Sequence, residues 1–379
     1  MLLVANHTLE ENRHGIPRQA GTATTGRLID AVEGTLADFL TDQIIALDAV
    51  DPALGGFART TRDLVLAGGK RLRPTFAYWG WRSVCRPGAP LDDVLPALAA
   101  LEMLHTFALV HDDVMDDSDT RRGRPTAHRL FAAQHARAGR LGDPDRFGNT
   151  AAILVGDLCL VWADQLIART PLPSATLFTV RACYDRMRVE AVAGQYLDVL
   201  GETAPETWSV ERALLVARYK TASYTVQRPL QLGLALAGIT LPSVGDAFDR
   251  YGRAVGEAFQ LRDDLLGTYG DPAVTGKSAG DDLRTGKPTA LLMLAHQLAT
   301  AAQRAELAID PAGGVIPADG SGGPRLASAI AATGAPERLE QMIRERVAEG
   351  VDALAGAPIQ PAAFEALTAL AVSATNRPA

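Results

Sequence analysis

The sequence contains little cysteine and no long apolar run, and both absences narrow the class of protein. Among 379 residues there are three cysteines, Cys85, Cys159 and Cys183, which are far apart and form no C-x-x-C pair. This pattern argues against a disulfide framework or a zinc site and is typical of a reducing, cytoplasmic environment. No stretch approaches the roughly twenty apolar residues of a membrane span, 96–110 being the best candidate, so we expect no transmembrane segment.

An excess of basic residues is also missing. The formal net charge is −7, whereas a nucleic-acid-binding domain normally carries a basic patch or stripe, so we expect no nucleic-acid partner. The sequence has no P-loop G-x-x-x-x-G-K-[ST], and no Ser/His/Asp arrangement stands out. These absences leave no sign of a nucleotide-binding loop or of a hydrolytic triad.

Alternating β-branched runs are nearly absent as well, which argues against a sheet. From about Leu28 onward the chain is instead Ala/Leu-rich with a helical period, interrupted by Gly/Pro-rich segments at 85–90, 139–148, 170–174 and 308–324. Since 47% of the residues are hydrophobic, a large core can be buried. We therefore predict an all-α fold, with a single-domain bundle of long helices over 26–379 and a disordered tail over 1–25.

Two Asp-rich segments stand out against this background. The first, H-D-D-V-M-D-D-S-D-T-R-R-G, runs from His111 to Gly123 at the end of a helix predicted over 96–116. Asp112 and Asp116 lie one turn apart on one helix face, where their like charges repel unless a cation lies between them. Mg²⁺ suits this place because it takes one or two carboxylates and completes its shell with water and phosphate. The alternative for this motif alone is a solvated acidic helix end.

The second Asp-rich segment, Phe259–Asp271, reads F-Q-L-R-D-D-L-L-G-T-Y-G-D. On a helix, Gln260, Asp263, Asp264 and Gly267 share one face. Carboxylates on two segments far apart in the chain indicate the facing walls of one metal site.

Cations accompany both acidic segments. Arg121 and Arg122 follow the first, Lys277 and Lys287 follow the second, and Lys220 lies on another predicted helix. The segment G-G-K-R-L-R-P at 68–74 combines flexible glycines with three cations, which suits an anion. Taken singly, each cation is typical of a solvated surface. Taken together, they predict one magnesium-bound diphosphate and a second diphosphate held by Lys and Arg.

Seven motifs follow one another over Gly68–Thr289: G-G-K-R-x-R-P, E-x-x-H, D-D-x-x-D…R-R-G, G-Q-x-x-D, Y-K-T, F-Q-x-x-D-D and G-K. This ordered set resembles the trans-type isoprenyl diphosphate synthases, especially the bacterial geranylgeranyl diphosphate synthases. The resemblance implies the isoprenoid synthase type I fold, with helices around a central cavity. It further implies a homodimeric, Mg²⁺-dependent prenyltransferase that condenses isopentenyl diphosphate with dimethylallyl, geranyl or farnesyl diphosphate.

The same resemblance implies the roles of the site residues. Three Mg²⁺ ions would be held by the aspartates Asp112, Asp113, Asp116, Asp263 and Asp264. The allylic diphosphate would be bound by Arg121, Lys220, Lys277 and Lys287, and isopentenyl diphosphate by Lys70, Arg73, His105 and Arg122. Thr221 and Gln260 would line the path of the allylic cation, with Gln195 and Asp198 in support. The catalytic set is then Asp112, Asp116, Asp263, Lys220, Thr221 and Gln260.

One position departs from the family's pattern. The second motif often reads D-D-x-x-D, but Gly267 occupies the third acidic position here. Because Asp263 remains, we expect activity to survive with altered metal contacts on that wall.

Product length is expected to depend on the residues just before Asp112. Ala108 lies one turn before it and leaves space for a chain, while Phe107 flanks the same channel. This pair suggests a C20 product, with a C15 or a longer product as the alternatives. The competing interpretation of Phe107 is an ordinary core aromatic.

Other functions are compatible with parts of the pattern. A class I terpene cyclase shares the helical fold, but its N-D-x-x-S-x-x-x-E motif is absent. A non-catalytic partner subunit would lack the Asp motifs, and a phosphohydrolase using His111 and Asp112 would leave the second acidic segment unexplained.

Overall fold

The computed structural model describes residues 18–86, 88–204, 207–270, 283, 287–307 and 323–376, with side chains from residue 25 onward. In these ranges nearly all regular structure is helical, which confirms the all-α prediction. The elements are α1 (Arg18–Asp48), α2 (Pro52–Val65), α3 (Leu72–Arg82), η1 (Leu91–Asp93), α4 (Leu95–Met115), β1 (Thr120–Arg121), β2 (Arg124–Pro125), α5 (Ala127–Arg137), α6 (Pro144–Ala168), α7 (Ser174–Thr203), α8 (Val210–Val216), η3 (Ala217–Gln227), α9 (Arg228–Leu236), α10 (Pro242–Tyr269), α13 (Ala290–Leu298), α14 (Ala301–Glu306), α15 (Gly323–Ala331), α16 (Ala335–Leu354) and α17 (Pro361–Thr375).

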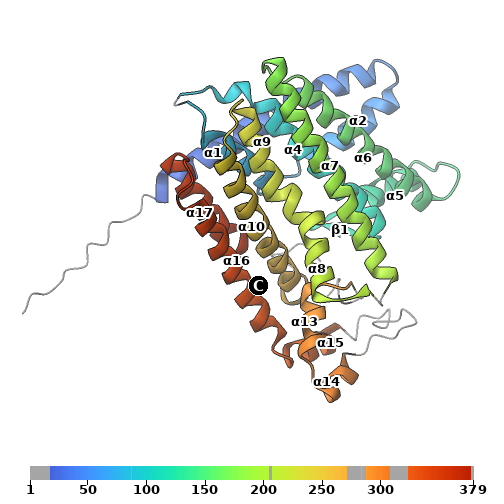
Figure 1. The fold of residues 1–379 in the computed structure, drawn as a ribbon. Helices are drawn as coiled ribbons and strands as arrows, with labels where there is room; N and C mark the ends of the chain where they lie inside the picture. Colours follow the sequence, from blue (N-terminus) through green and yellow to red (C-terminus); the bar gives the residue numbers. More distant parts are fainter. Residues whose placement is uncertain are drawn as a thin grey trace, which may run out of the picture.

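The long helices run side by side, with α10 in the middle of the bundle (Figure 1). The helices α16 and α17 lie on one side of α10, and α5, α6 and α7 lie on the other. In closer detail α10 packs against α16 and η3, α4 against α6, and α3 against α9. The largest fully buried side chains belong to Trp162, Tyr184, Tyr251, Phe76 and Phe248. This apolar core fixes the helices whose polar ends form the site.

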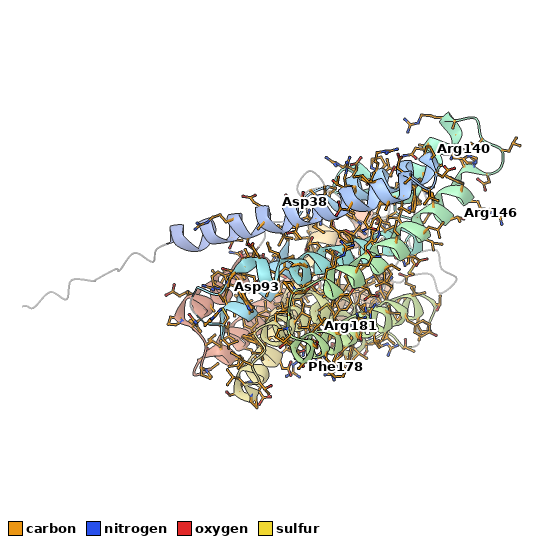
Figure 2. The ribbon with its side chains drawn as sticks, turned by 90° about the horizontal axis from the view of Figure 1, so that it is seen from above. Asp38, Asp93, Arg140, Arg146, Phe178 and Arg181 are labelled. Atoms are coloured by element: carbon orange, nitrogen blue, oxygen red, sulfur yellow. The ribbon has the colours of Figure 1, made fainter. Side chains whose placement is uncertain are left out.

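Helix α1 runs along the outside of the bundle, where Asp38 marks its course (Figure 2). It begins at Arg18, inside the segment 1–25 that was expected to be disordered, while residues 1–17 lie outside the described part of the chain. The expected break at 139–148 is shorter than predicted, because α6 already begins at Pro144. Asp143 accepts a hydrogen bond from the backbone N–H of Asp145, and a proline is tolerated in the first turn.

The helix α6 corrects one expectation. Over Pro144–Ala168 it is long and apolar enough to cross a bilayer, so it is a better candidate than 96–110. Half of its apolar window is buried inside the molecule, and the helix packs against α4 and α5. It therefore contributes to the core of the bundle.

A two-stranded hairpin is the other departure, since no sheet was expected. The strands β1 and β2 are antiparallel, with Thr120 opposite Pro125 and Arg121 opposite Arg124. The turn between them has Arg122 and Gly123 at φ of 53° and 71°, in the left-handed region. This turn places two consecutive arginines directly after the end of α4.

The segment η3 is a π-helix, continuous with α8 before it and α9 after it. A helix was predicted around Lys220, but its widened geometry was not. Such segments are rare and frequently occur at functional sites. Opposite η3 on α7 is Gly194, where an added Cβ would come within 2.2 Å of the Lys220 backbone nitrogen. A glycine is therefore needed for η3 to approach α7 this closely.

Candidate active site

The polar ends of the central helices enclose one large cavity, of about 1280 Å³. Its walls come from the segment 69–73, from α4, from the hairpin that follows it, from α7, α8, η3 and α10, and from the segment just before α13. Nearly all of the predicted site residues line it: Lys70, Arg73, His105, Phe107, Ala108, Asp112, Asp116, Arg121, Arg122, Lys220, Thr221, Gln260, Asp263, Asp264 and Lys287, together with Gln195, Asp198 and Gly267. Motifs from distant parts of the chain thus meet in one place.

Every lysine in the part of the chain that the structure describes lines this cavity. The sequence holds four lysines, Lys70, Lys220, Lys277 and Lys287, whereas its other basic residues are arginines and histidines. Three of the four line the cavity, and Lys277 lies outside the described residues. An ammonium group is a compact point charge that suits phosphate oxygens. Counting lysines would have indicated the anion site from the sequence.

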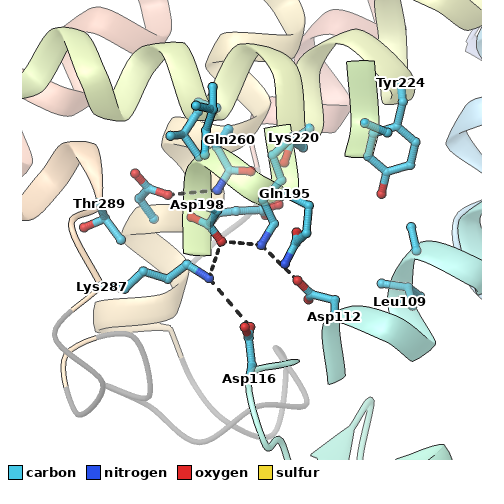
Figure 3. A pocket seen from close by; sticks show the side chains of 18 of the residues that line it. Leu109, Asp112, Asp116, Gln195, Asp198, Lys220, Tyr224, Gln260, Lys287 and Thr289 are labelled. Atoms are coloured by element: carbon cyan, nitrogen blue, oxygen red, sulfur yellow. Dashed lines mark hydrogen bonds and ion pairs between the residues drawn. The ribbon is translucent and has the colours of Figure 1, made fainter. Parts of the chain in front are cut away.

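Two of these three lysines, Lys220 and Lys287, share a buried carboxylate (Figure 3). Asp198, one turn beyond Gly194 on α7, lies 2.5 Å from Lys220 Nζ and 2.8 Å from Lys287 Nζ. Burial alone would lower the pKa of Lys287, but Asp198 and Asp116 outweigh it and hold that pKa well above its ordinary value. Both ammonium groups therefore stay charged and point into the cavity.

The first acidic pair is neutralised unevenly. Asp112 Oδ1 lies 2.9 Å from Lys220 Nζ, and its Oδ2 lies 3.2 Å from the Arg121 guanidinium. Burial would raise the pKa of Asp112, yet these two cations lower it. The pKa of Asp116 is raised by burial and by the charge of Asp112, and Lys287, 3.6 Å away, offsets this only in part. Negative charge thus remains in excess at the end of α4.

Asp113, the middle carboxylate of the first motif, has a different environment. Its side chain is buried and accepts a 2.7 Å hydrogen bond from Arg121 Nε. It is absent from the cavity lining, although it was expected to support the metal site. In this position it orients Arg121, whose guanidinium also reaches Asp112.

The second acidic segment lies on α10, and its two adjacent aspartates also have different environments. Asp264 is buried and accepts hydrogen bonds from Gln260 Nε2 at 2.9 Å and from the backbone N–H of Ala290 at 3.0 Å. It thereby anchors the first turn of α13, next to Lys287. Asp263 is half-buried and lines the cavity, one turn before Gly267. Of the two aspartates, Asp263 is the better placed to meet a ligand.

A separate basic cluster forms the other end of the cavity. Arg73 is buried and donates to Thr225 Oγ1 at 2.8 Å, while its Nε is buried with no hydrogen-bond partner. Arg122 reaches the carbonyl oxygen of Gly68. His105 lies nearby, and its pKa is held well below the ordinary value by burial and by the guanidinium groups of Arg73 and Arg122. This end combines a neutral imidazole with cations, which suits an anion that brings no metal.

The side chains present fit a Mg²⁺ ion that is bound together with a diphosphate. Within the described ranges, no three His, Cys, Asp or Glu side chains converge as they would in an all-protein metal site. Mg²⁺ does not need such a cage, because substrate phosphates and water supply the remaining oxygens. The excess negative charge at Asp112 and Asp116, which line the same cavity as Asp263, fits an ion that arrives with a diphosphate.

Three lining residues were missed by sequence reasoning. Arg71 is buried and its guanidinium lies 2.7 Å from Glu102, so it holds the glycine-rich segment on α4. Tyr224 lines the cavity beside His105 and Arg73. Arg212 lines the cavity from α8, and its buried Nε has no hydrogen-bond partner. None of these three belongs to a motif position that was assigned a ligand.

The chain is similar in sequence and in structure to known prenyl diphosphate synthases. A geranylgeranyl pyrophosphate synthase from Corynebacterium glutamicum, solved with isoprenyl diphosphate and magnesium, has a TM-score of 0.87 and 39% identity, covering 92% of this chain and 98% of that one. The geranylgeranyl diphosphate synthase of Methanosarcina mazei is 31% identical over 63% of this chain and 67% of its own length. The octaprenyl diphosphate synthase of Escherichia coli is 33% identical over 83% and 88%.

The family itself is shown by a match that covers most of the chain. The family model described as polyprenyl synthetase matches residues 56–309, a span that includes every predicted site residue. Members of this family are magnesium-dependent prenyltransferases. The chain belongs to the polyprenyl synthetase family, the trans-isoprenyl diphosphate synthases.

Proposed function

We propose that this prenyltransferase condenses isopentenyl diphosphate with allylic diphosphates and releases geranylgeranyl diphosphate, a C20 product. The observation that carries the proposal is that one cavity joins a metal-compatible anion site, at Asp112 and Lys220, to a metal-free basic site, at Arg73 and His105. A head-to-tail condensation needs both, because one diphosphate departs while the other is only held.

The roles follow from the two sites. Asp112 and Asp116, with Asp263 opposite, would hold up to three Mg²⁺ ions, which when bound would neutralise charge on the departing diphosphate. Lys220, Lys287 and Arg121 would bind the same group, and such preorganised donors are worth most where they stabilise developing charge. The carbonyl and side-chain oxygens near Thr221 and Gln260 would face the allylic cation. Lys277, outside the described residues, remains a proposed fourth cation.

At the other site, Lys70, Arg73, His105 and Arg122 would hold isopentenyl diphosphate with its double bond toward the cation. The new C–C bond forms from the electron pair of that double bond. The positive charge then lies on the other carbon of the former double bond. The carbon next to it loses a proton to the released diphosphate, which Lys220 and Arg121 would retain. Water has to be kept out during these steps, since it would capture the cation.

The C20 length is the finer part of the proposal. Similar proteins include farnesyl and geranylfarnesyl synthases as well as the geranylgeranyl and octaprenyl synthases, so family membership leaves the length open. Support comes from Ala108, which lines the cavity one turn from Asp112. Phe107 lines it too and packs edge-on against His111, with ring centroids 4.9 Å apart. The methyl group at 108 leaves a passage that the ring at 107 borders.

We also propose that 26–379 forms one domain, that the protein is a homodimer and that it is cytoplasmic. On α7 the exposed apolar residues Val189, Val192, Tyr196 and Val199 recur at spacings of three and four, as in a helix–helix seam. Val192 and Tyr196 also line the cavity, so a second copy on this face would close its wall. The cysteines are unpaired in the structure, which suits a reducing compartment.

The decisive experiment is product analysis with Mg²⁺, isopentenyl diphosphate and each of the C5, C10 and C15 allylic diphosphates. We expect C20 as the end product from all three starters. An end product of C15 or longer than C20 would refute the length but not the reaction. Incubation with geranylgeranyl diphosphate alone should give no hydrocarbon, whereas a terpene cyclase would release one.

The dimer has its own test. By light scattering we expect a mass about twice the 40.1 kDa of the chain. Val189→Asp should yield the monomer because it places a charge in the proposed seam, while Val50→Asp, at another exposed valine, should not. A wild-type protein that runs as a monomer would contradict the proposal.

A further inference from the structure

Tyr224 joins two groups of the basic site that lie far apart in the sequence. It projects from η3 into the cavity opposite α4 (Figure 3), and only 8% of its surface is exposed. The guanidinium carbon of Arg73 lies 4.2 Å from the centre of its ring. Its hydroxyl oxygen lies 3.4 Å from Nδ1 of His105. One side chain therefore contacts both a cation and the imidazole of this site.

The stacking contact compensates for an incomplete set of hydrogen bonds. Arg73 is buried, donates to Thr225 Oγ1 and leaves its Nε buried without a partner. A guanidinium over an aromatic face gains electrostatic attraction, most of all when it is desolvated. The ring of Tyr224 thus holds Arg73 in place while its remaining donors stay available for an anion.

The hydroxyl contact decides which nitrogen of His105 carries the proton. Burial and the neighbouring arginines keep the pKa of His105 well below its ordinary value, so the ring is neutral and has one N–H. A phenol is the stronger acid of the two, so it donates to the basic imidazole nitrogen, which makes Nδ1 the acceptor. The single N–H of His105 is then on Nε2. The 3.4 Å separation is long, as catalytic hydrogen bonds often are before ligand binds.

We propose that Tyr224 is a positioning residue for the diphosphate of isopentenyl diphosphate, because it supports Arg73 through its ring and selects the Nε2–H tautomer of His105 through its hydroxyl. In that tautomer His105 presents a donor to phosphate oxygens between the guanidinium groups. The opposite tautomer would present a lone pair and repel the anion. This inference rests on the proposed function, since it names a residue that prepares one of its two sites.

Steady-state kinetics of two variants separate the contribution of the Tyr224 ring from that of its hydroxyl. Tyr224→Phe keeps the ring beneath Arg73 and removes the hydroxyl, so we expect KM for isopentenyl diphosphate to rise about tenfold. The kcat and the KM for the allylic diphosphate should stay within about twofold. Tyr224→Leu removes the ring as well and should raise the same KM further. Tyr184→Phe is the matched control, because it deletes a buried hydroxyl that has no hydrogen-bond partner and lies outside the cavity lining.

Spectroscopy tests the tautomer without any substrate. The protein has seven histidines, so ¹⁵N-histidine labelling with His105→Gln as the assignment variant identifies the signals of His105. We expect its proton on Nε2 in the wild type and a shift toward the Nδ1–H form in Tyr224→Phe. In a His105→Gln background the hydroxyl should no longer affect KM, because its effect passes through the imidazole.

Two results would overturn the inference: a wild-type His105 protonated on Nδ1, or a Tyr224→Phe enzyme whose KM for isopentenyl diphosphate is unchanged. The proposed function fails in a different way, through a wild-type protein that forms no prenyl product from isopentenyl and allylic diphosphates. The two failures are therefore distinguishable in one set of assays.

Discussion

Ala108→Phe is the substitution that tests the length of the product most directly. Ala108 lies on α4 one turn before Asp112 and lines the cavity. Phe107 beside it lines the same cavity and packs against His111. A phenyl ring at 108 would therefore lie across the path of a chain that grows away from the diphosphate.

The expected change in the product ratio follows from the free energy of excluding one isoprene unit. An isoprene unit adds five carbons, and each buried CH₂ is worth about 0.8 kcal/mol, so excluding the unit forfeits roughly 4 kcal/mol. If the walls shift to admit it, overpacking costs about 1–3 kcal/mol instead. A shift of the walls costs less free energy than exclusion of the unit and therefore determines the outcome. The ratio of C15 to C20 product should then rise roughly 5- to 150-fold.

The assay is chromatography of the dephosphorylated products from geranyl diphosphate and isopentenyl diphosphate. Ala133→Phe makes the same change at an exposed position on α5 and should leave the products unaltered. An active, folded Ala108→Phe enzyme with the wild-type product ratio would show that the chain does not pass residue 108.

Three further outcomes follow from the same contacts. Lys287→Gln removes one of the two ammonium groups on Asp198 and should lower kcat about 10²- to 10³-fold at unchanged thermal stability. Arg71→Met leaves buried Glu102 without its partner and should lower the free energy of unfolding by about 3–5 kcal/mol, measured by denaturant titration. The folded pKa of His105 lies below its unfolded value, so the unfolded chain binds the extra proton and stability falls as pH drops below about 6.5. His105→Gln should remove that part of the slope, at most about 1.4 kcal/mol per pH unit, in denaturant titrations at successive pH values.

The placement of the acidic residues was predictable only in part. Helical spacing alone places Asp112 and Asp116 on one face, and the cavity confirms that placement. Spacing could not rank consecutive carboxylates. Asp113 is buried against Arg121, and Asp264 caps α13 through Ala290, because helices distant in sequence pack there. Which of two adjacent aspartates meets a ligand is a tertiary outcome.

The basic site shows a different limit. Lys70 and Arg73 could be read from the motif at 68–74, and Arg122 from the first Asp-rich segment, but Tyr224 could not. A π-helix has no recognised sequence period, and η3 brings Tyr224 to His105 from 119 positions along the chain. No role was therefore assigned to Tyr224 from the sequence, and only the fold places its hydroxyl beside an imidazole.

The charges at the proposed site for the allylic diphosphate form one alternating series rather than separate pairs. Arg121 contacts Asp112, Asp112 contacts Lys220, Lys220 contacts Asp198, and Asp198 contacts Lys287, which faces Asp116. In such a series the lysines cannot turn fully to a diphosphate while the carboxylates retain them. A divalent cation at Asp112 and Asp116 would take over the carboxylates and release the lysines. By thermodynamic reciprocity, the diphosphate must then strengthen metal binding as much as the metal strengthens diphosphate binding. The loss of a carboxylate at Gly267 weakens only the far wall, and leaves this exchange at the end of α4 intact.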